Sequence, residues 1–223
     1  IEAFNSIKWE SYFKTPSNIL DLACGIGWVS AKLSKLTNVN NIYCVDSSKF
    51  YVKNMLPKIF DHLKGDKKKV IPIEGMFYPI LLKNNSLDGV VLSAAIHHST
   101  EMEKLLNEIH RVLKPGGFLF ILNENPLSNL RFILKCSKFY IKVFIHLLFK
   151  KYNSSKQILS YTSYLDDPDL GDNVYPEWVL LKILENCTFE DIKKINSGFL
   201  HSKNEDHARN DMLIHYICKK REI

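Results

Sequence analysis

The fold is decided by a stretch near the N-terminus that reads Ile19-Leu20-Asp21-Leu22-Ala23-Cys24-Gly25-Ile26-Gly27-Trp28-Val29-Ser30. It begins with an apolar run, continues through two glycines one residue apart, and then returns to helical spacing. This order predicts a strand, a tight loop and a helix. Glycines in such a loop let a ligand approach bare backbone, and the following helix directs N–H groups at that ligand.

Apolar strands and amphipathic helices alternate along the next hundred residues. Strands are expected at 19–22, 41–46, 70–74, 87–93 and 118–123, with helices to about 36, from 48 to about 63 and at 101–113. A helix at 2–14 precedes them, and a helix at 176–187 and strands at 189–197 and 212–219 close the chain. Such alternation predicts parallel β-α-β units with right-handed crossovers. The expected fold is therefore α/β, a doubly wound, seven-stranded, mainly parallel sheet.

Length and composition favour one domain. The chain has 223 residues, 46% of them hydrophobic, which allows one sizeable core. We find no signal-peptide pattern and no apolar run long enough to span a bilayer. The five cysteines form no C-x-x-C pair, and most lie in apolar patterns. Buried thiols in a reducing compartment, and hence a soluble cytoplasmic protein, are the expectation.

The net charge of +6 comes from one segment. Residues 125–165 contain seven basic residues and no acidic one, and without these seven, 23 basic residues face 24 acidic ones. A surplus this local argues against a protein that coats nucleic acid, and no nucleic-acid partner is expected.

Ligands of doubly wound sheets bind at the carboxyl ends of the strands, so polar residues at strand ends are the candidates for ligand binding. Asp46 ends the second strand, 19 residues after Gly27, where a carboxylate can accept both hydroxyls of a ribose. That feature also fits a dinucleotide-binding enzyme, but Ser30 stands where the dinucleotide fingerprint has its third glycine. Asp21, inside the first strand, suits a ligand with an ammonium group better than a pyrophosphate, although it could also order the loop by accepting backbone N–H groups.

Five segments in this order and spacing resemble the class I S-adenosylmethionine-dependent methyltransferases, in particular the small-molecule branch that includes ubiquinone-biosynthesis-type enzymes. The segments are Leu20 to Gly27, Asp46, Glu74-Gly75 ahead of Pro79, Leu87 to Ser93 followed by His97-His98, and Glu108 to Gly117. The resemblance covers roughly residues 18–123 and implies S-adenosylmethionine as the cofactor.

Carried over to this chain, the resemblance assigns the methionine end of the cofactor to Asp21, Gly25 and Gly27. It assigns the ribose to Asp46 and the adenine edge to Glu74 with the Gly75 backbone. The expected cofactor contacts are Asp21, Ala23, Cys24, Gly25, Gly27, Asp46, Ser47, Glu74, Gly75, Met76 and Ser93. The adenine contact departs from the family pattern, which usually has Asp at position 74 and a small residue in place of Ile73.

His97, His98 and Glu124 are the candidate catalytic residues. The two histidines follow the fourth strand, and an imidazole there could take a proton from a substrate hydroxyl. Glu124 lies just beyond the fifth strand and is another candidate base. Each could instead be structural, since methyl transfer needs little beyond alignment and a deprotonated acceptor.

A metal site is not expected. The acids of Asp166-Asp167-Pro168-Asp169-Leu170-Gly171-Asp172 lie in a Pro/Gly setting typical of a solvated turn. Metal-dependent relatives of this fold typically place a carboxylate at the end of the fourth strand, where this chain has Ser93.

The basic segment predicts an amphipathic insert. Arg131, Lys135, Lys138, Lys142 and His146 fall on one helical stripe, with apolar residues on the wider remaining arc. Three interpretations stay open: a lid packing its apolar face on the sheet, a lid whose cations receive an anionic substrate, and a helix at 127–152 lying on a membrane surface. The implied division is an N-terminal helix (1–17), a cofactor-binding core (18–125), a helical lid or substrate cap (126–175), and a C-terminal helix with closing strands (176–223).

The sequence thus predicts a methyltransferase for a small or conjugated metabolite. O-methylation of an anionic sugar or surface-glycan precursor is the first hypothesis. Alternatives are a lipid or quinone methyltransferase at the membrane surface, a nucleotide-dependent dehydrogenase, and a catalytically inactive methyltransferase-like binding module. The acceptor atom and the oligomeric state are not determined by the sequence.

Overall fold

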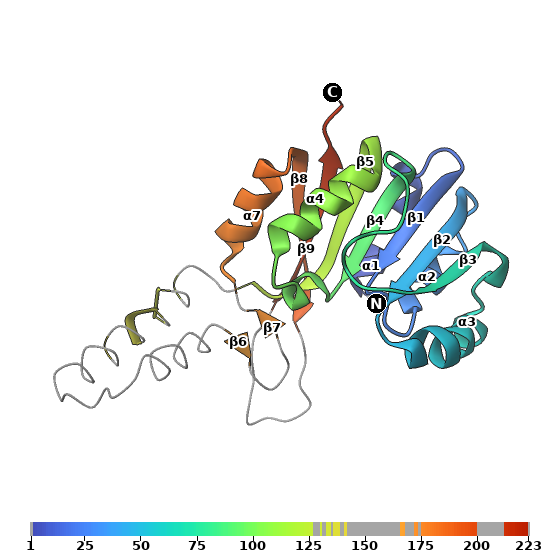
Figure 1. Ribbon diagram of the computed structural model, residues 1–223, viewed down its shortest axis with the longest axis horizontal. Coiled ribbons are helices and arrows are strands. Elements are labelled where there is room, and N and C mark those ends of the chain that lie inside the picture. Colours follow the sequence, from blue (N-terminus) through green and yellow to red (C-terminus); the bar gives the residue numbers. More distant parts are fainter. Residues whose placement is uncertain are drawn as a thin grey trace.

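The computed structural model contains one seven-stranded sheet with helices on both faces (Figure 1). The residues that the structure describes are 2–126, 130, 133–134, 136–138, 141, 166–167, 172–173, 175–199 and 212–222. The strands are β1 (Ser17–Leu22), β2 (Val39–Asp46), β3 (Val70–Glu74), β4 (Leu87–Ser93), β5 (Leu113–Glu124), β8 (Phe189–Phe199) and β9 (Met212–Lys220).

The strand order is β3-β2-β1-β4-β5-β9-β8. Strands β1 to β5 run parallel, and β9 is antiparallel to both of its neighbours. The expected doubly wound, mainly parallel sheet of seven strands is confirmed. Because the order reverses direction between β1 and β4, polar residues at the carboxyl ends of these central strands meet at the edge where such sheets bind ligands.

The helices are α1 (Glu2–Ser6), α2 (Trp28–Leu33), α3 (Leu56–Leu63), α4 (Met102–Val112) and α7 (Glu177–Asn186), with short helical turns η1 (Trp9–Ser11), η2 (Tyr51–Met55), η3 (Lys67–Lys69) and η4 (Ile96–His98). Most of the helices connect strands, whereas α1 and η1 precede β1. A separate two-stranded ladder pairs β6 (Asp166–Asp167) with β7 (Asp172–Asn173). None of the helices in the described part of the chain is long and apolar enough to cross a membrane.

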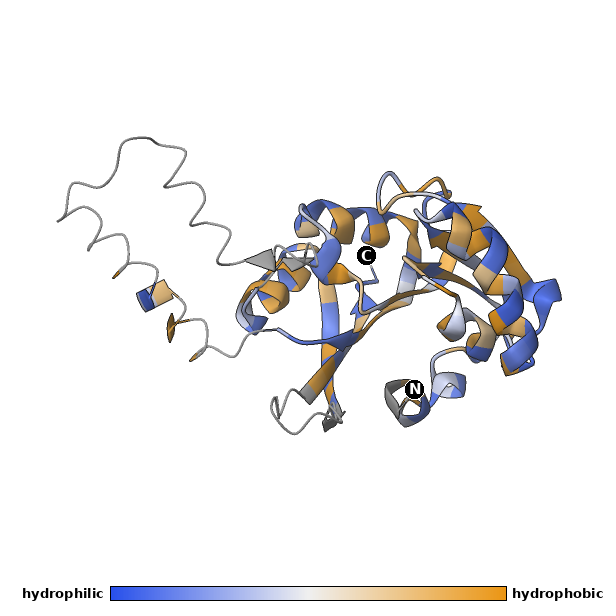
Figure 2. Ribbon diagram, turned by 90° about the horizontal axis from the view of Figure 1, so that it is seen from below, coloured by the Kyte–Doolittle hydropathy of each residue, from blue (hydrophilic) through white to orange (hydrophobic). Residues whose placement is uncertain are grey.

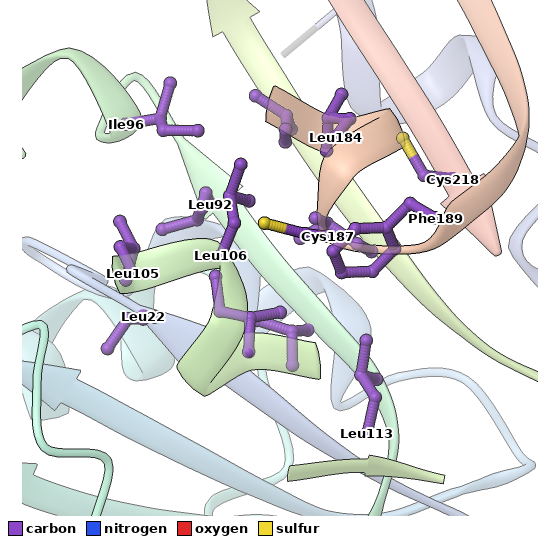
Figure 3. Packing of buried hydrophobic residues seen from close by; sticks show 14 of the residues in the cluster. Leu22, Leu92, Ile96, Leu105, Leu106, Leu113, Leu184, Cys187, Phe189 and Cys218 are labelled. Atoms are coloured by element: carbon purple, nitrogen blue, oxygen red, sulfur yellow. The ribbon is translucent and has the colours of Figure 1, made fainter. Parts of the chain in front are cut away.

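The sheet carries an apolar layer on each face. On one face, buried side chains of α4 and α7 pack against β4 and β5, as Leu105, Leu106 and Leu184 do in Figure 3. On the other, the N-terminal segment, α2 and α3 cover β1 and β2. Figure 2 shows the hydrophobic residues along the sheet and the hydrophilic ones mainly on outer helices and loops. A sheet covered on both faces explains why β4 is an almost uninterrupted apolar run.

The single helix predicted at 2–14 is wrong. The structure has α1, a break after Ser6, and then η1. In an unbroken helix, Phe4 and Trp9 would point about 140° apart. The break lets both pack in the same apolar layer, where Phe120 of β5 lies 4.7 Å from the Trp9 ring and the Trp9 indole donates to Phe4 O. Tertiary packing therefore overrides the helical periodicity.

One further boundary differs from the predictions. The expected stop at 114–117 is part of β5, because α4 ends at Val112 and the chain pairs with β4 from Leu113 onward, with a register shift that absorbs the extra residues. The helix predicted from 48 to about 63 is confirmed: residues 49–63 are helical, and η2 is a π-helical turn within this helix. The predicted lid at 126–175, including Arg131, Lys135, Lys142 and His146, lies largely outside the described residues.

Candidate active site

The glycine loop after β1 presents bare backbone on one side and packed backbone on the other. Gly25 has φ +54°, and a Cβ added there would meet no atom within 4 Å. Gly27 has φ +83°, and a Cβ there would lie 3.0 Å from the Leu56 side chain of α3. Both positions favour glycine because L-residues rarely adopt these angles. The loop therefore leaves room for a ligand beside Gly25 while Gly27 closes against α3.

Asp21 has one oxygen committed to the fold and one without a partner. Its carboxylate is 1% exposed, and Oδ2 accepts hydrogen bonds from Ser30 N (3.1 Å) and Ser30 Oγ (2.5 Å). In the described part of the chain, Oδ1 has no hydrogen-bond partner. Burial raises the pKa of Asp21 to about 6. A buried acceptor without a donor is costly and suits a ligand that supplies a positively charged donor.

Asp46 holds the glycine loop as well as facing the site. Its Oδ2 accepts from Gly25 N and its Oδ1 from Ser48 N, each at 2.8 Å. Each carboxylate oxygen has two lone pairs, so the half-buried Asp46 retains acceptor capacity for hydroxyl groups. Ser48, rather than the exposed Ser47, orders the following turn, because Ser48 Oγ accepts from Tyr51 N at 3.3 Å.

The residues expected at the adenine edge lie at the end of β3 and just after it. Glu74 ends β3 beside Asp46 and is exposed, Met76 is 69% exposed, and Gly75 N donates to Asp46 O at 3.0 Å. They lie next to Asp46, the carboxylate that the resemblance assigns to the ribose. An exposed Glu74 leaves the adenine contact the weakest part of the predicted set.

Ala23 and Cys24 form the start of the glycine loop and connect it to β2. Ala23 has φ +55°, and Cys24 N donates to Val45 O at 3.0 Å, which ties the loop to β2. A hydrogen bond with Cys44 and burial raise the pKa of the Cys24 thiol, so it stays protonated. All five cysteines are free thiols, as expected, and all but Cys136 are buried.

The ends of β4 and β5 form the other half of the site. Ser93 Oγ accepts from Asn123 Nδ2 at 2.9 Å. Glu124, the last residue of β5 and 1% exposed, accepts from His97 Nδ1 at 2.8 Å, and the ring centroids of His97 and the exposed His98 are 4.2 Å apart. The structure therefore joins His97 to Glu124 by a hydrogen bond and places the His98 ring against the His97 ring.

Tyr175 is the residue that sequence reasoning missed. Its hydroxyl donates to Glu124 Oε2 at 3.1 Å, although 51 residues separate the two in sequence. It directly precedes the Pro176 that opens α7, and no motif around it indicates a polar role. The acidic run at 166–172 contributes β6 and β7, and the described residues contain no group of three side chains that could hold a metal ion.

Comparison with known proteins identifies the first half of the chain. Residues 20–121 match the family model described as a methyltransferase domain. The chain carries a class I S-adenosylmethionine-dependent methyltransferase domain. The matched residues contain the glycine loop, Asp46 and the His97 turn, so the resemblance drawn from the sequence is confirmed.

The relatives of this methyltransferase domain act on different acceptors. The chain is 31% identical over 136 residues to a ubiquinone/menaquinone biosynthesis C-methyltransferase of Campylobacter jejuni, covering 59% of this chain and 54% of that one. It is 33% identical over 110 residues to a sterol 24-C-methyltransferase of Neurospora crassa, covering 47% of this chain and 27% of the relative. The chain thus spans about half, or less, of the length of these relatives.

The fold comparison agrees. A SAM-dependent methyltransferase from Aquifex aeolicus superposes with a TM-score of 0.58 at 19% identity, covering 95% of this chain and 87% of that one. At this identity the match supports the fold alone.

The methyltransferase domain fits its cofactor. S-adenosylmethionine carries an ammonium group that could meet the partnerless Oδ1 of Asp21, and ribose hydroxyls that could meet Asp46. The open side of Gly25 leaves space beside both. These individual contacts, and those of Ser47, Glu74, Met76 and Ser93, stay predictions.

Cofactor binding is expected to release a proton near pH 6. Free Asp21, with a pKa of about 6, is about half protonated at that pH, and an ammonium group beside Oδ1 would lower the pKa. Calorimetry with S-adenosylhomocysteine in buffers of different ionisation enthalpy should therefore show release of roughly half a proton at pH 6.

At pH 7 the same titration is the control, since Asp21 is then mostly ionised and release should fall to roughly a tenth of a proton. Equal release at both values, or proton uptake at pH 6, would contradict the placement of the ammonium group at Asp21.

Proposed function

We propose that this chain transfers a methyl group from S-adenosylmethionine to a small acceptor that must lose a proton. The observation that carries the proposal is the contact of His97 with buried Glu124, at the same sheet edge as Asp21, Gly25 and Asp46. A bound cofactor supplies an electrophilic methyl group on a sulfonium. The chain's own contribution is to hold the cofactor at Asp21 and Asp46 and to take the acceptor's proton at His97.

His97 is the preferred base over its neighbours. Histidine gains and loses a proton near working pH, and His97 is partly exposed whereas Glu124 is buried. His98 lies ring to ring with His97 and is the candidate for orienting the acceptor. These roles belong to the proposal.

A lipid- or quinone-type acceptor is the preferred substrate class. The two relatives described above are named as a ubiquinone/menaquinone biosynthesis C-methyltransferase and a sterol 24-C-methyltransferase. Within the described part of the insert, large apolar side chains are exposed: Leu130 (68%), Ile133 (58%), Leu134 (52%) and Ile141 (58%). These four residues are helical, and the protein does not cover their side chains. Exposed apolar side chains on a helix suit the surface of a lipid bilayer.

The anionic sugar precursor, which was the first hypothesis from the sequence, becomes the second candidate. It is supported by the basic stripe, of which Lys138 is described and exposed. A basic helix suits an anionic acceptor as well as an anionic lipid surface.

Methyl transfer from labelled S-adenosylmethionine tests these alternatives. Two acceptors should be offered in parallel: a hydroxylated, prenylated quinol in anionic vesicles, and a nucleotide-linked sugar in solution. Label in the quinol supports the preferred class, and label in the sugar alone supports the second candidate. Cofactor binding with no labelled product from either acceptor or from a cell extract would instead support an inactive binding module.

The membrane contact has its own prediction. Reversing Lys135, Lys138 and Lys142 to Glu should weaken binding to anionic vesicles by about a hundredfold or more, because each basic residue near such a surface contributes about 1 kcal/mol. Vesicle co-sedimentation measures this. The control reverses the three lysines of η3, which changes the net charge equally at another place. Equal weakening in both variants would indicate a general charge effect and would contradict a specific contact between the insert and the membrane.

A further inference from the structure

The side chain of Glu124 has all of its acceptor positions occupied. Oε1 accepts from Ala95 N (3.0 Å) and Ile96 N (3.3 Å), and Oε2 accepts from His97 Nδ1 (2.8 Å) and Tyr175 OH (3.1 Å). A carboxylate offers about four lone-pair positions. Glu124 is therefore poorly placed to take a proton from an acceptor itself, although it was a candidate base.

The contact with Glu124 determines which nitrogen of His97 carries the proton. An ionised carboxylate can only accept, so Nδ1 must donate at 2.8 Å. In the neutral ring the lone pair then resides on Nε2, on the other side of the imidazole. The two backbone N–H groups fix the carboxylate relative to the turn that carries the histidine, so tautomer and ring position are set together.

Tyr175 connects this pair to the end of the insert. Its side chain is 8% exposed, and burial together with the Glu124 charge raises the pKa of its hydroxyl, so it remains a donor. Strand β7, just before it, packs against η4, the turn that contains His97. The described end of the insert thus lies beside the histidine turn through β7 and contacts Glu124 through the Tyr175 hydroxyl.

We infer that Glu124 and Tyr175 are positioning residues that jointly control the proton affinity of His97. Glu124 fixes the Nε2 lone pair and stabilises the protonated ring, and the Tyr175 hydroxyl draws charge away from the carboxylate and moderates that effect. The inference rests on the proposed function, in which His97 accepts the acceptor's proton. It adds two residues beyond the matched family segment, Glu124 and Tyr175, to the machinery of the reaction.

Other ionisable groups lie near Glu124 and His97, and the test leaves these residues unsubstituted. His98 lies beside the His97 ring. Tyr216 of β9 is near Glu124, and its hydroxyl donates to Glu177, which pairs with Lys194. None of these is altered by the two substitutions below.

The test is an NMR titration of His97 in the full chain, with the resonances assigned through His97→Gln. Glu124→Gln should lower the His97 pKa by about 1 unit or more, because the negative partner of the imidazolium is lost. Tyr175→Phe should raise it by a few tenths of a unit, because the carboxylate loses a competing donor. The nitrogen shifts of the wild-type ring should report a neutral form protonated at Nδ1.

Opposite shifts in the two variants support the inference, whereas a purely structural role would give no shift or shifts of the same sign, and either result overturns it. If Glu124→Gln does not fold, the rise in Tyr175→Phe decides alone. Titration with S-adenosylhomocysteine separates this test from the proposed function. Both variants should bind it within about twofold of wild type. A wild-type chain that does not bind it contradicts the proposed function but leaves the result of the His97 titration valid.

Discussion

Glu124→Ala is expected to lower the free energy of unfolding by about 3–5 kcal/mol, the largest effect of any single change considered for this chain. The substitution removes the acceptor of two backbone N–H groups, an imidazole and a buried tyrosine hydroxyl at once. Each buried donor left without a partner costs about 1–3 kcal/mol, and relaxation or an entering water recovers part of the sum. Urea denaturation followed by circular dichroism measures the change.

Two controls separate loss of the contacts from loss of a carboxylate. Glu124→Gln keeps the shape and one strong acceptor, so it should cost clearly less than the alanine variant. Glu74→Ala removes an exposed carboxylate at the end of β3 and should change the free energy of unfolding by no more than about 0.5 kcal/mol. A cost below about 1 kcal/mol for Glu124→Ala would mean that this network does not hold the β4 and β5 ends together.

The sheet and half of the site could be predicted because they depend on local patterns. Apolar runs of strand length separated by helical spacing determine a parallel sheet, and such a sheet brings its carboxyl ends to one edge. Asp21, Gly25, Gly27 and Asp46 were found this way, since each lies at or beside a strand end. The family match to residues 20–121 covers the same segment.

What could not be predicted depends on contacts between distant segments. Tyr175 reaches Glu124 across 51 residues, and nothing in its own surroundings announces a buried hydroxyl. The break after Ser6 likewise follows from packing against Phe120 of β5, more than a hundred residues away. Even for Asp46 the sequence did not predict the hydrogen bond to Gly25 N, because this bond joins β2 to the loop after β1 and depends on the fold.

The two halves of the site therefore respond differently to change. The cofactor half consists of short contacts around the glycine loop, each with an acceptor still available, as in Asp21 and Asp46. The half around Glu124 is saturated by protein donors. A ligand can add interactions in the first half, whereas in the second the existing network can only be strengthened or weakened. Cofactor affinity should thus depend on the first half.

Asp46→Ala is accordingly expected to weaken S-adenosylhomocysteine binding by about 1–3 kcal/mol, roughly 5- to 150-fold in affinity. The ribose hydroxyls would lose their carboxylate acceptor, and Gly25 N and Ser48 N would lose theirs in the free protein, which loosens the glycine loop before any ligand arrives. Isothermal titration calorimetry measures the affinity, and the melting temperature without ligand reports the loop contribution.

The matched control is again Glu74→Ala. Glu74 lies in register with Asp46 on the neighbouring strand, but in the described structure its carboxylate accepts no hydrogen bond from the loop N–H groups. If Glu74 contacts the adenine edge, its loss should cost less than the loss of Asp46, because an exposed hydrogen bond competes with water. An Asp46→Ala variant with unchanged affinity would remove Asp46 from the cofactor site. A lowered melting temperature with unchanged affinity would restrict Asp46 to ordering the loop, and the ribose would then need another acceptor near the end of β2.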